Sequence, residues 1–215
     1  MRLKSKIELR QWTKSLAKNA YPANHGLAAS AKRLTENLFH LFQGLGSGLG
    51  NALNLSFFPA NLAAFFPSEN EPKILHYLWS DDRFRLAFPD KMTAMLGQKF
   101  YFLRPRPIQW EFVRRLYYSK ENLYYLPEMR ELKNQKISLE DFPFVLVPGL
   151  VFSYSGQRLG RGQGHYDRVL SQYCGIKIGI CYEEYLLEDC WEISAHDQQM
   201  DYIVTEKQII SCKYF

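Results

Sequence analysis

A glycine-rich basic segment concentrates the residues whose types and spacing could carry chemistry. Residues 156–168 read GQRLGRGQGHYDR and hold four glycines, three arginines, a histidine, a tyrosine and an aspartate. Glycines let backbone N–H groups come close to an anion, and the guanidinium groups of Arg158 and Arg161 suit phosphate oxygens. We therefore predict that this segment binds a polyphosphate.

The neighbouring segments favour the same interpretation. The apolar run 142–152 (FPFVLVPGLVF) is typical of a strand buried on both faces, and residues 166–174 have helical spacing. Proteins with an α/β fold bind ligands where such strands end, and the N-terminus of the following helix adds a partial positive charge. The spacing matches neither G-x-G-x-x-G, because residue 165 is His, nor a Walker loop. A glycine-rich turn with solvated arginines is the alternative interpretation.

The remaining elements predict how this segment is positioned. A second glycine-rich stretch, GLGSGLGN (44–51), contains no basic residue, and we interpret it as a connector that ends the preceding helix. Strands separated by helical segments indicate a parallel sheet covered on both sides. We predict a single three-layer α/β/α domain over residues 1–215, with a mainly parallel sheet and a basic N-terminal helix. The predicted helices cover 3–19, 27–43, 73–81 and 166–174, and the predicted strands cover 61–67, 84–89, 142–152, 176–182 and 201–206.

Composition and charge exclude several classes of protein. The chain is 47% hydrophobic and 23% charged, close to globular averages of about 45–50% and about 25%. Six Lys and Arg against one Glu in the first eighteen residues account for the whole net charge of +5, so the rest of the chain is neutral. A nucleic-acid surface needs a continuous basic stripe. A nucleic-acid-binding module is therefore an alternative that this distribution disfavours.

The cysteines and the apolar segments indicate a cytoplasmic protein. The four cysteines show no C-x-x-C pair, which predicts free thiols rather than a zinc ribbon. The N-terminus lacks the apolar core of a secretory signal. Residues 37–68 carry no formal charge, but their glycines, asparagines and prolines do not suit a membrane span, which needs about 20 predominantly apolar residues.

Four blocks of the chain together resemble one enzyme family. Residues 142–170 are similar to the 5-formyltetrahydrofolate cyclo-ligase (5,10-methenyltetrahydrofolate synthetase) family, whose pattern is a hydrophobic strand, V-P-G, F, and G-x-R-L-G-R-G-x-G-Y-Y-D. KIELR (6–10) resembles its K-x-x-L-R, and HDQQMDYIVTE (196–206) resembles its H-D-x-x-x-D-x-I-x-T-E. A weaker block is FFPSENEPKIL (65–75). The sequence departs from the family at His165, where a tyrosine is usual, and at Ser153, which replaces an aspartate.

The resemblance implies an enzyme that closes a ring at the expense of ATP. The family converts 5-formyltetrahydrofolate to 5,10-methenyltetrahydrofolate with ATP as co-substrate and Mg²⁺ as cofactor. Arg161 and Tyr166 would take part in catalysis. The residues that match the family's ATP site are Lys6, Arg10, Arg158, Gly160, Arg161, Gly162, Gln163, Gly164, His165 and Tyr166.

Metal and folate ligands are also implied by the resemblance. Asp167 and Asp197 match the family's metal aspartates, and carboxylate oxygens are ligands that Mg²⁺ prefers. Asp167 could instead act at the start of a helix, and Asp197 is one of eight acids between residues 178 and 206. Phe66 and Glu71 would contact folate, because a carboxylate suits the adjacent N–H donors of an aminopyrimidinone.

Several alternatives remain open at this point. Glu69 is a near alternative to Glu71, and Trp110, Tyr124 and Tyr125 could line the folate site, although core packing suits them as well. His165 lies within the implied site, so a paralogue that uses ATP on another N-formyl or carboxylate substrate is the alternative function. We expect a monomer that acts on small molecules, with no nucleic-acid or membrane partner.

Overall fold

The structure is a computed structural model of the chain. It describes residues 5–19, 25–49, 60–65, 71–79, 84–89, 102–103, 136–137, 142–188 and 191–212.

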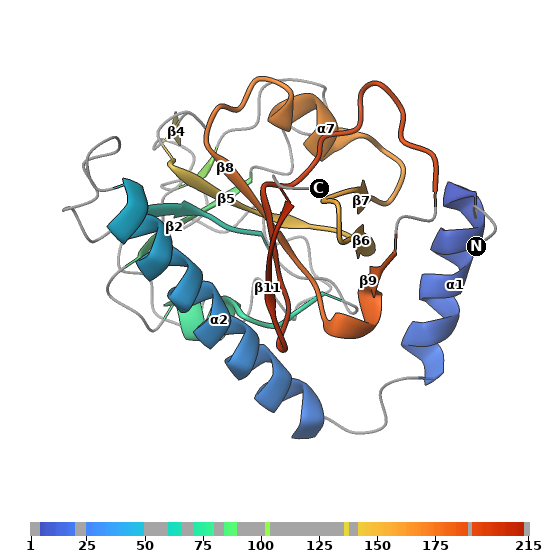
Figure 1. The fold of residues 1–215 in the computed structure, drawn as a ribbon, viewed down its shortest axis with the longest axis horizontal. Helices are drawn as coiled ribbons and strands as arrows, with labels where there is room; N and C mark the ends of the chain where they lie inside the picture. The colour runs from blue at the N-terminus through green and yellow to red at the C-terminus, as the bar shows by residue number, and fades with distance from the viewer. Residues whose placement is uncertain are drawn as a thin grey trace, which may run out of the picture.

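A mostly parallel sheet forms the centre of the molecule (Figure 1). Within the described residues the strand order is β11 (Ile209–Ser211), β10 (Tyr202–Val204), β8 (Ile176–Ile180), β5 (Phe144–Pro148), β1 (Ala60–Ala63), β2 (Phe84–Pro89), β3 (Phe102–Leu103) and β4 (Lys136–Ile137). The five strands from β10 to β2 are mutually parallel. The pairs β10–β11, β2–β3 and β3–β4 are antiparallel. The predicted α/β fold with a mainly parallel sheet is confirmed.

Apolar residues alternate between the two faces of this sheet, as a strand buried on both sides requires. In β5, Phe144 and Leu146 belong to the core on one face, whereas Val145 and Val147 belong to the core on the other. The first face is covered by α2 (His25–Leu49) and by α3 (Leu75–Trp79), whose buried leucines pack against it.

The opposite face carries α7 (His165–Leu170) and a second sheet. This small sheet contains β7 (Arg158–Leu159), β6 (Val151–Ser153) and β9 (Leu186–Leu187), and a 3-10 turn, η3 (Glu183–Tyr185), leads into β9. Phe152 of β6 is fully buried, and a Cβ on Gly179 of β8 would lie only 2.5 Å from its ring. The glycine therefore makes room for the ring, and the two sheets pack closely.

The basic helix α1 (Lys6–Asn19) packs against the small sheet rather than over the central one. Leu9 is fully buried in a cluster with Val151, Leu159 and Trp191. Figure 1 shows α1 beside β6, β7 and β9, with α2 on the far side of the central strands. The first predicted helix is thus confirmed, and its partner is the sheet that contains the glycine-rich segment.

Three details of the predicted elements are wrong. The run 142–152 forms two strands, because the chain leaves the central sheet after Pro148 and β6 pairs with β7 and β9. The glycines after residue 43 do not end α2, which continues to Leu49 while Leu45 still packs on the core. The strand at 201–206 is the last one that the sequence predicts, yet β11 follows it after a turn in which the Thr205 hydroxyl accepts hydrogen bonds from two backbone N–H groups.

None of the helices in the described part of the chain is long and apolar enough to cross a membrane. Within the same residues Cys174 and Cys181 are free thiols, as predicted, and Cys212 forms no disulfide bond. Cys190 lies outside the described residues.

Candidate functional site

The glycine-rich segment contains β7, a loop over residues 160–164 and the first residues of α7. Gly162 and Gly164 have φ angles of 98° and 63°, which side chains with a Cβ rarely adopt. Gly164 is the residue immediately before the first turn of α7. Arg161, Gly162 and Gln163 are exposed, while His165 and Tyr166 are half-buried. The loop thus presents its tip to solvent, as the polyphosphate prediction requires.

Helix α1 brings two basic side chains to this loop. Arg10 Nε donates a hydrogen bond of 3.0 Å to the carbonyl oxygen of Gly160. Lys6, one turn earlier, forms an ion pair with Asp197 and donates a 3.2 Å hydrogen bond to Ser194 Oγ. Segments that are 150 and more residues apart in the sequence therefore meet at one place.

Asp197 is held as a carboxylate. Its Oδ2 accepts hydrogen bonds from Lys6 and, at 2.7 Å, from the backbone N–H of Ser194. Partial burial alone would raise the pKa of Asp197, but these hydrogen bonds and the Lys6 charge outweigh it, and the pKa lies below its usual value. The side chain is therefore ionised at neutral pH.

Asp167 lies in the same corner of the molecule. Its Oδ1 accepts a 2.8 Å hydrogen bond from Arg158 and a longer one, 3.4 Å, from the backbone N–H of Gln198, the neighbour of Asp197. No group of three or more His, Cys, Asp and Glu side chains that could hold a metal occurs among the described residues. Mg²⁺ usually takes only one or two protein carboxylates and completes its shell with water and phosphate, so two aspartates are enough in number for such an ion.

Arg158 and Tyr166 form the floor of the site. The Arg158 side chain is 4% exposed, and its guanidinium carbon lies 5.5 Å from the centre of the Tyr166 ring. Burial and the nearby charge of Glu71 raise the pKa of Tyr166 above its usual value, and Arg158 opposes them only in part. The phenol is therefore protonated over the physiological range and can donate a hydrogen bond.

Glu71 reaches the loop from the other side. Its Oε1 lies 3.6 Å from a guanidinium nitrogen of Arg161, whose side chain is 59% exposed, while that of Glu71 is only 7% exposed. The structure thus brings the weaker block that contains Glu71 to the same site. Phe66 and Glu69 lie outside the described residues, as do Trp110, Tyr124 and Tyr125.

Two site residues were missed in the sequence. Ser194 contacts both Lys6 and Asp197, and Gln198 contacts Asp167. The spacing S-x-x-D of Ser194 and Asp197 is a signal that could have identified the first, because this pattern closes a turn through reciprocal hydrogen bonds. Gln198 contributes only its backbone, so no residue type indicates it.

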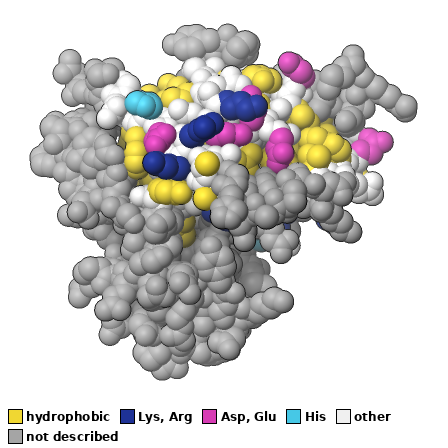
Figure 2. All heavy atoms as spheres, turned by 90° about the horizontal axis from the view of Figure 1, so that it is seen from below, with side chains coloured by type: hydrophobic (Ala, Val, Ile, Leu, Met, Phe, Trp, Pro, Cys, Tyr) yellow, Lys and Arg dark blue, Asp and Glu magenta, His cyan; other side chains and the backbone are white. Residues whose placement is uncertain are grey.

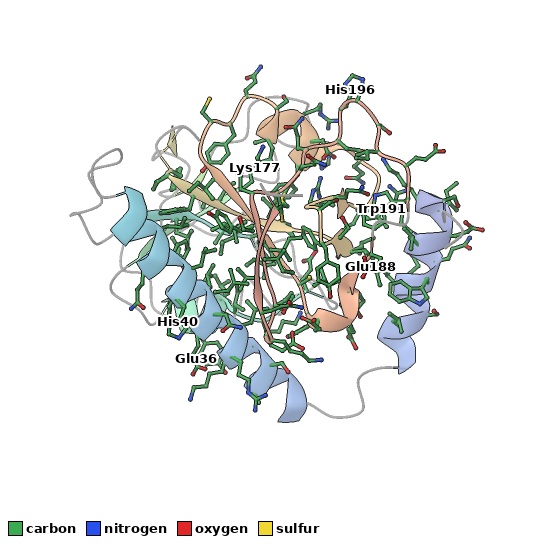
Figure 3. All side chains as sticks on the ribbon, viewed as in Figure 1. Glu36, His40, Lys177, Glu188, Trp191 and His196 are labelled. Carbon is green, nitrogen blue, oxygen red and sulfur yellow. The ribbon has the colours of Figure 1, made fainter. Side chains whose placement is uncertain are left out.

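Charges of both signs alternate around the described part of the surface that Figure 2 shows. Figure 3 shows Trp191 between the small sheet and α1, and His196 at the outer end of the loop that carries Ser194 and Asp197. His196 is exposed. The loop thus fastens to α1 at its base and presents its tip to solvent.

Comparisons with known proteins point to one family. A family model described as the 5-formyltetrahydrofolate cyclo-ligase family matches residues 69–206, which is more than half of the chain. A Schizosaccharomyces pombe protein named probable 5-formyltetrahydrofolate cyclo-ligase is 32% identical over 82 residues, 33% of this chain and 40% of that protein. An Arabidopsis thaliana protein named 5-formyltetrahydrofolate cyclo-ligase, mitochondrial, is 25% identical over 158 residues, 67% of this chain and 51% of that protein. The matches therefore span about half or less of the length of these curated relatives.

Solved structures share the fold. The 5,10-methenyltetrahydrofolate synthetase of Aquifex aeolicus matches 98% of this chain and 94% of its own, with a TM-score of 0.65 and 22% identity. That of Mycoplasma pneumoniae matches 94% of this chain and 98% of its own, with a TM-score of 0.61 and 18% identity.

Proposed function

Because the chain belongs to the 5-formyltetrahydrofolate cyclo-ligase family, we propose that it catalyses the ATP-dependent closure of 5-formyltetrahydrofolate to 5,10-methenyltetrahydrofolate, with release of ADP and phosphate. The observation that carries this proposal is the meeting of three other segments at the glycine-rich loop and the adjacent helix α7. Lys6 and Arg10 arrive from α1, Glu71 from the segment before α3, and Asp197 from the loop after β9.

The reaction needs ATP because an N-formyl group is amide-like and its oxygen is a poor leaving group. Transfer of the γ-phosphoryl group from ATP to the formyl oxygen releases ADP and makes that oxygen part of a phosphate ester. N10 then attacks the carbon, phosphate leaves with the oxygen, and N10 loses its proton as the methenyl bridge forms. Phosphoryl transfer of this kind depends on positioning and on charge neutralisation. Three basic side chains near the exposed loop would position the phosphates and neutralise their charge: Lys6, Arg10 and Arg161.

The acidic side chains have separate tasks in this proposal. Asp167 and Asp197 would hold Mg²⁺, which supplies neutralising charge to the phosphates when bound. Glu71, buried beside Arg161, would accept hydrogen bonds from the N–H groups of the folate ring.

The remaining site residues would contact the two substrates. Tyr166 carries its proton and would donate a hydrogen bond to the formyl oxygen. Phe66 would contact the folate ring, and Gly160, Gly162, Gln163, Gly164 and His165 would surround the phosphates.

The direct test mixes purified protein with 5-formyltetrahydrofolate and follows the near-ultraviolet absorption of the methenyl product. We expect the signal to require both ATP and Mg²⁺ and to disappear when a non-hydrolysable ATP analogue replaces ATP. No ATP-dependent signal at high enzyme concentration would contradict the proposal.

A second candidate function follows from His165. This side chain replaces the usual tyrosine at the start of α7, within the loop that would bind ATP. A paralogue that uses ATP on another N-formyl or carboxylate substrate would bind ATP normally yet form no methenyl product. ATP binding measured by calorimetry beside the absorption assay separates the two functions.

A monomeric state, a cytoplasmic location and the absence of nucleic-acid partners stay predictions from the sequence. Light scattering after size-exclusion chromatography, cell fractionation and a filter-binding assay with single-stranded nucleic acid test them in turn.

A further inference from the structure

We propose that Arg158 is a positioning residue, which holds Asp167 and Tyr166 in place and does not itself bind the phosphates of ATP. This inference rests on the proposed function, because the groups that Arg158 orients are assigned by it. It also separates Arg158 of β7 from Arg161, which has the same residue type and lies three residues later, in the loop that follows β7.

Burial closes Arg158 to a ligand. Its side chain is 4% exposed, against 59% for Arg161. Arg158 Nε has no accessible surface and no hydrogen-bond acceptor among the described residues, so this donor is not presented to solvent. A phosphate that approaches the loop from solvent can therefore reach Arg161, whereas Arg158 is closed to it.

The two terminal nitrogens of Arg158 are already used to join three elements. One donates a 3.2 Å hydrogen bond to the carbonyl oxygen of Pro148 at the end of β5, and the other donates the 2.8 Å bond to Asp167 of α7. The guanidinium carbon also lies over the Tyr166 ring, 5.5 Å from its centre, and the face of an aromatic ring attracts a cation. The planar guanidinium group of arginine can contact the Pro148 carbonyl, Asp167 and the Tyr166 ring at the same time, whereas the ammonium group of lysine cannot.

The glycine at position 160 fits this role. A Cβ at Gly160 would lie 2.9 Å from a terminal nitrogen of Arg158, and the φ angle of Gly160 is outside the left-handed region. Space for the guanidinium, rather than backbone conformation, therefore explains this glycine. The substitution Gly160→Ala should displace the guanidinium and leave the rest of the loop in place, since the clash falls on the end of a flexible side chain.

The first experiment uses the unaltered protein. Arginine modification by phenylglyoxal, with sites identified by peptide mass spectrometry, should label Arg161 and be slowed by ATP, while Arg158 stays unlabelled with or without ATP. Labelling of Arg158 that ATP prevents would overturn the proposal. This result does not depend on turnover, so it stands even if the cyclo-ligase assay fails.

The second experiment compares Gly160→Ala, Arg158→Lys and Arg161→Met. For Arg158→Lys we expect metal-free ATP to bind within about threefold of its normal affinity and kcat to fall by about tenfold or more, the loss expected for one charge-assisted hydrogen bond. Gly160→Ala should lower kcat to a similar extent. Arg161→Met should instead weaken metal-free ATP binding by about tenfold or more. Gly160→Ala should add little to Arg158→Lys, because both disturb the same group.

Two results would overturn the assignment of Arg158. One is a loss of metal-free ATP binding in Arg158→Lys that equals the loss in Arg161→Met. The other is a lower melting temperature with unchanged kcat in both Arg158→Lys and Gly160→Ala, which would make Arg158 a structural residue only. If Arg158→Lys does not fold, kcat of Gly160→Ala and the labelling experiment still test whether Arg158 is a positioning residue.

Discussion

The ion pair of Lys6 and Asp197 joins the first helix to the loop after β9. Both side chains are about one quarter exposed. We predict that Lys6→Met lowers the free energy of unfolding at neutral pH by about 0.5–1 kcal/mol, as expected for a partly screened pair. Urea unfolding of the wild type and the variant measures this difference. Lys14→Met, an exposed lysine on the same helix, is the matched control and should change little.

The difference in free energy of unfolding between the wild type and Lys6→Met should become smaller at acidic pH. Because Lys6 lowers the pKa of folded Asp197, its stabilisation is fully present above the ordinary value of about 3.8 and is lost as the pH falls through the lowered pKa. The gap between wild type and Lys6→Met should therefore narrow below that pH. A gap that stays constant through the acidic range would mean that Lys6 does not act through Asp197.

Glu71 offers a second prediction at the residue scale. Glu71→Gln removes a buried negative charge, so KM for 5-formyltetrahydrofolate should rise by about tenfold or more, while ATP affinity changes little. The pKa of Tyr166 should fall, because the Glu71 charge helps to raise it. Steady-state kinetics and a spectroscopic tyrosine titration measure the two effects. Glu36→Gln, on the exposed side of α2, is the control, and an equal effect there would contradict the prediction.

At the scale of elements, the docking of α1 determines whether Lys6 and Arg10 reach the loop. Leu9→Ala should lower the free energy of unfolding by about 2–5 kcal/mol, because Leu9 is fully buried against the small sheet. ATP binding should weaken with it, since both basic residues lie on this helix. Ile7, 65% exposed on the same helix, is the control, and Ile7→Ala should change stability by no more than about 0.5 kcal/mol. Equal effects of the two variants in urea unfolding would exclude this docking.

Two glycines should respond in opposite ways to the same substitution. Gly162→Ala forces a Cβ into a φ of 98° and should destabilise the protein by about 1–2 kcal/mol. Gly44 lies within α2 with open space around it, so Gly44→Ala should stabilise the protein by about 0.5–1 kcal/mol. Thermal unfolding of the two variants shows whether each substitution lowers or raises stability. Destabilisation by Gly44→Ala would argue against a helix at residue 44.

The element pattern was predictable where apolar spacing and packing agree. The strand at 84–89 has the same bounds as β2, and the helix predicted over 3–19 is α1. Chain direction was not predictable at Pro148: residues 142–152 are apolar throughout, yet pairing with β7 and β9 moves residues 151–153 to another sheet. The spacing of apolar residues predicts that a strand is buried, but it does not predict in which sheet the strand lies.

The sequence indicated which residues lie near the candidate site, but it did not indicate which contacts they make there. Glycine and arginine types singled out the loop between β7 and α7, and family blocks singled out Lys6, Glu71 and Asp197, which the structure places near it. The burial of Arg158 was not predictable, because it depends on the Pro148 carbonyl group and on the space at Gly160, which no residue type encodes.

For the whole molecule, the contact between the two sheets predicts cooperative unfolding. Gly179→Ala would place a Cβ 2.5 Å from the Phe152 ring and should cost about 1–3 kcal/mol by overpacking. Thermal transitions followed by far-ultraviolet circular dichroism and by tryptophan fluorescence, to which Trp191 contributes beside the small sheet, should shift together. A fluorescence transition that stays at the wild-type temperature would show that the small sheet unfolds as a separate unit and would contradict the single domain.

The Lys6–Asp197 pair spans 191 positions of the sequence, and this separation has a consequence for protein synthesis. A ribosome makes Lys6 well before it makes Asp197. The nascent chain therefore carries a basic helix whose acidic partner does not yet exist, and contacts of such long range form late in folding. Catalytic competence should appear only when synthesis has passed the loop of Ser194 and Asp197, so ribosome-bound chains stalled before that loop should be inactive.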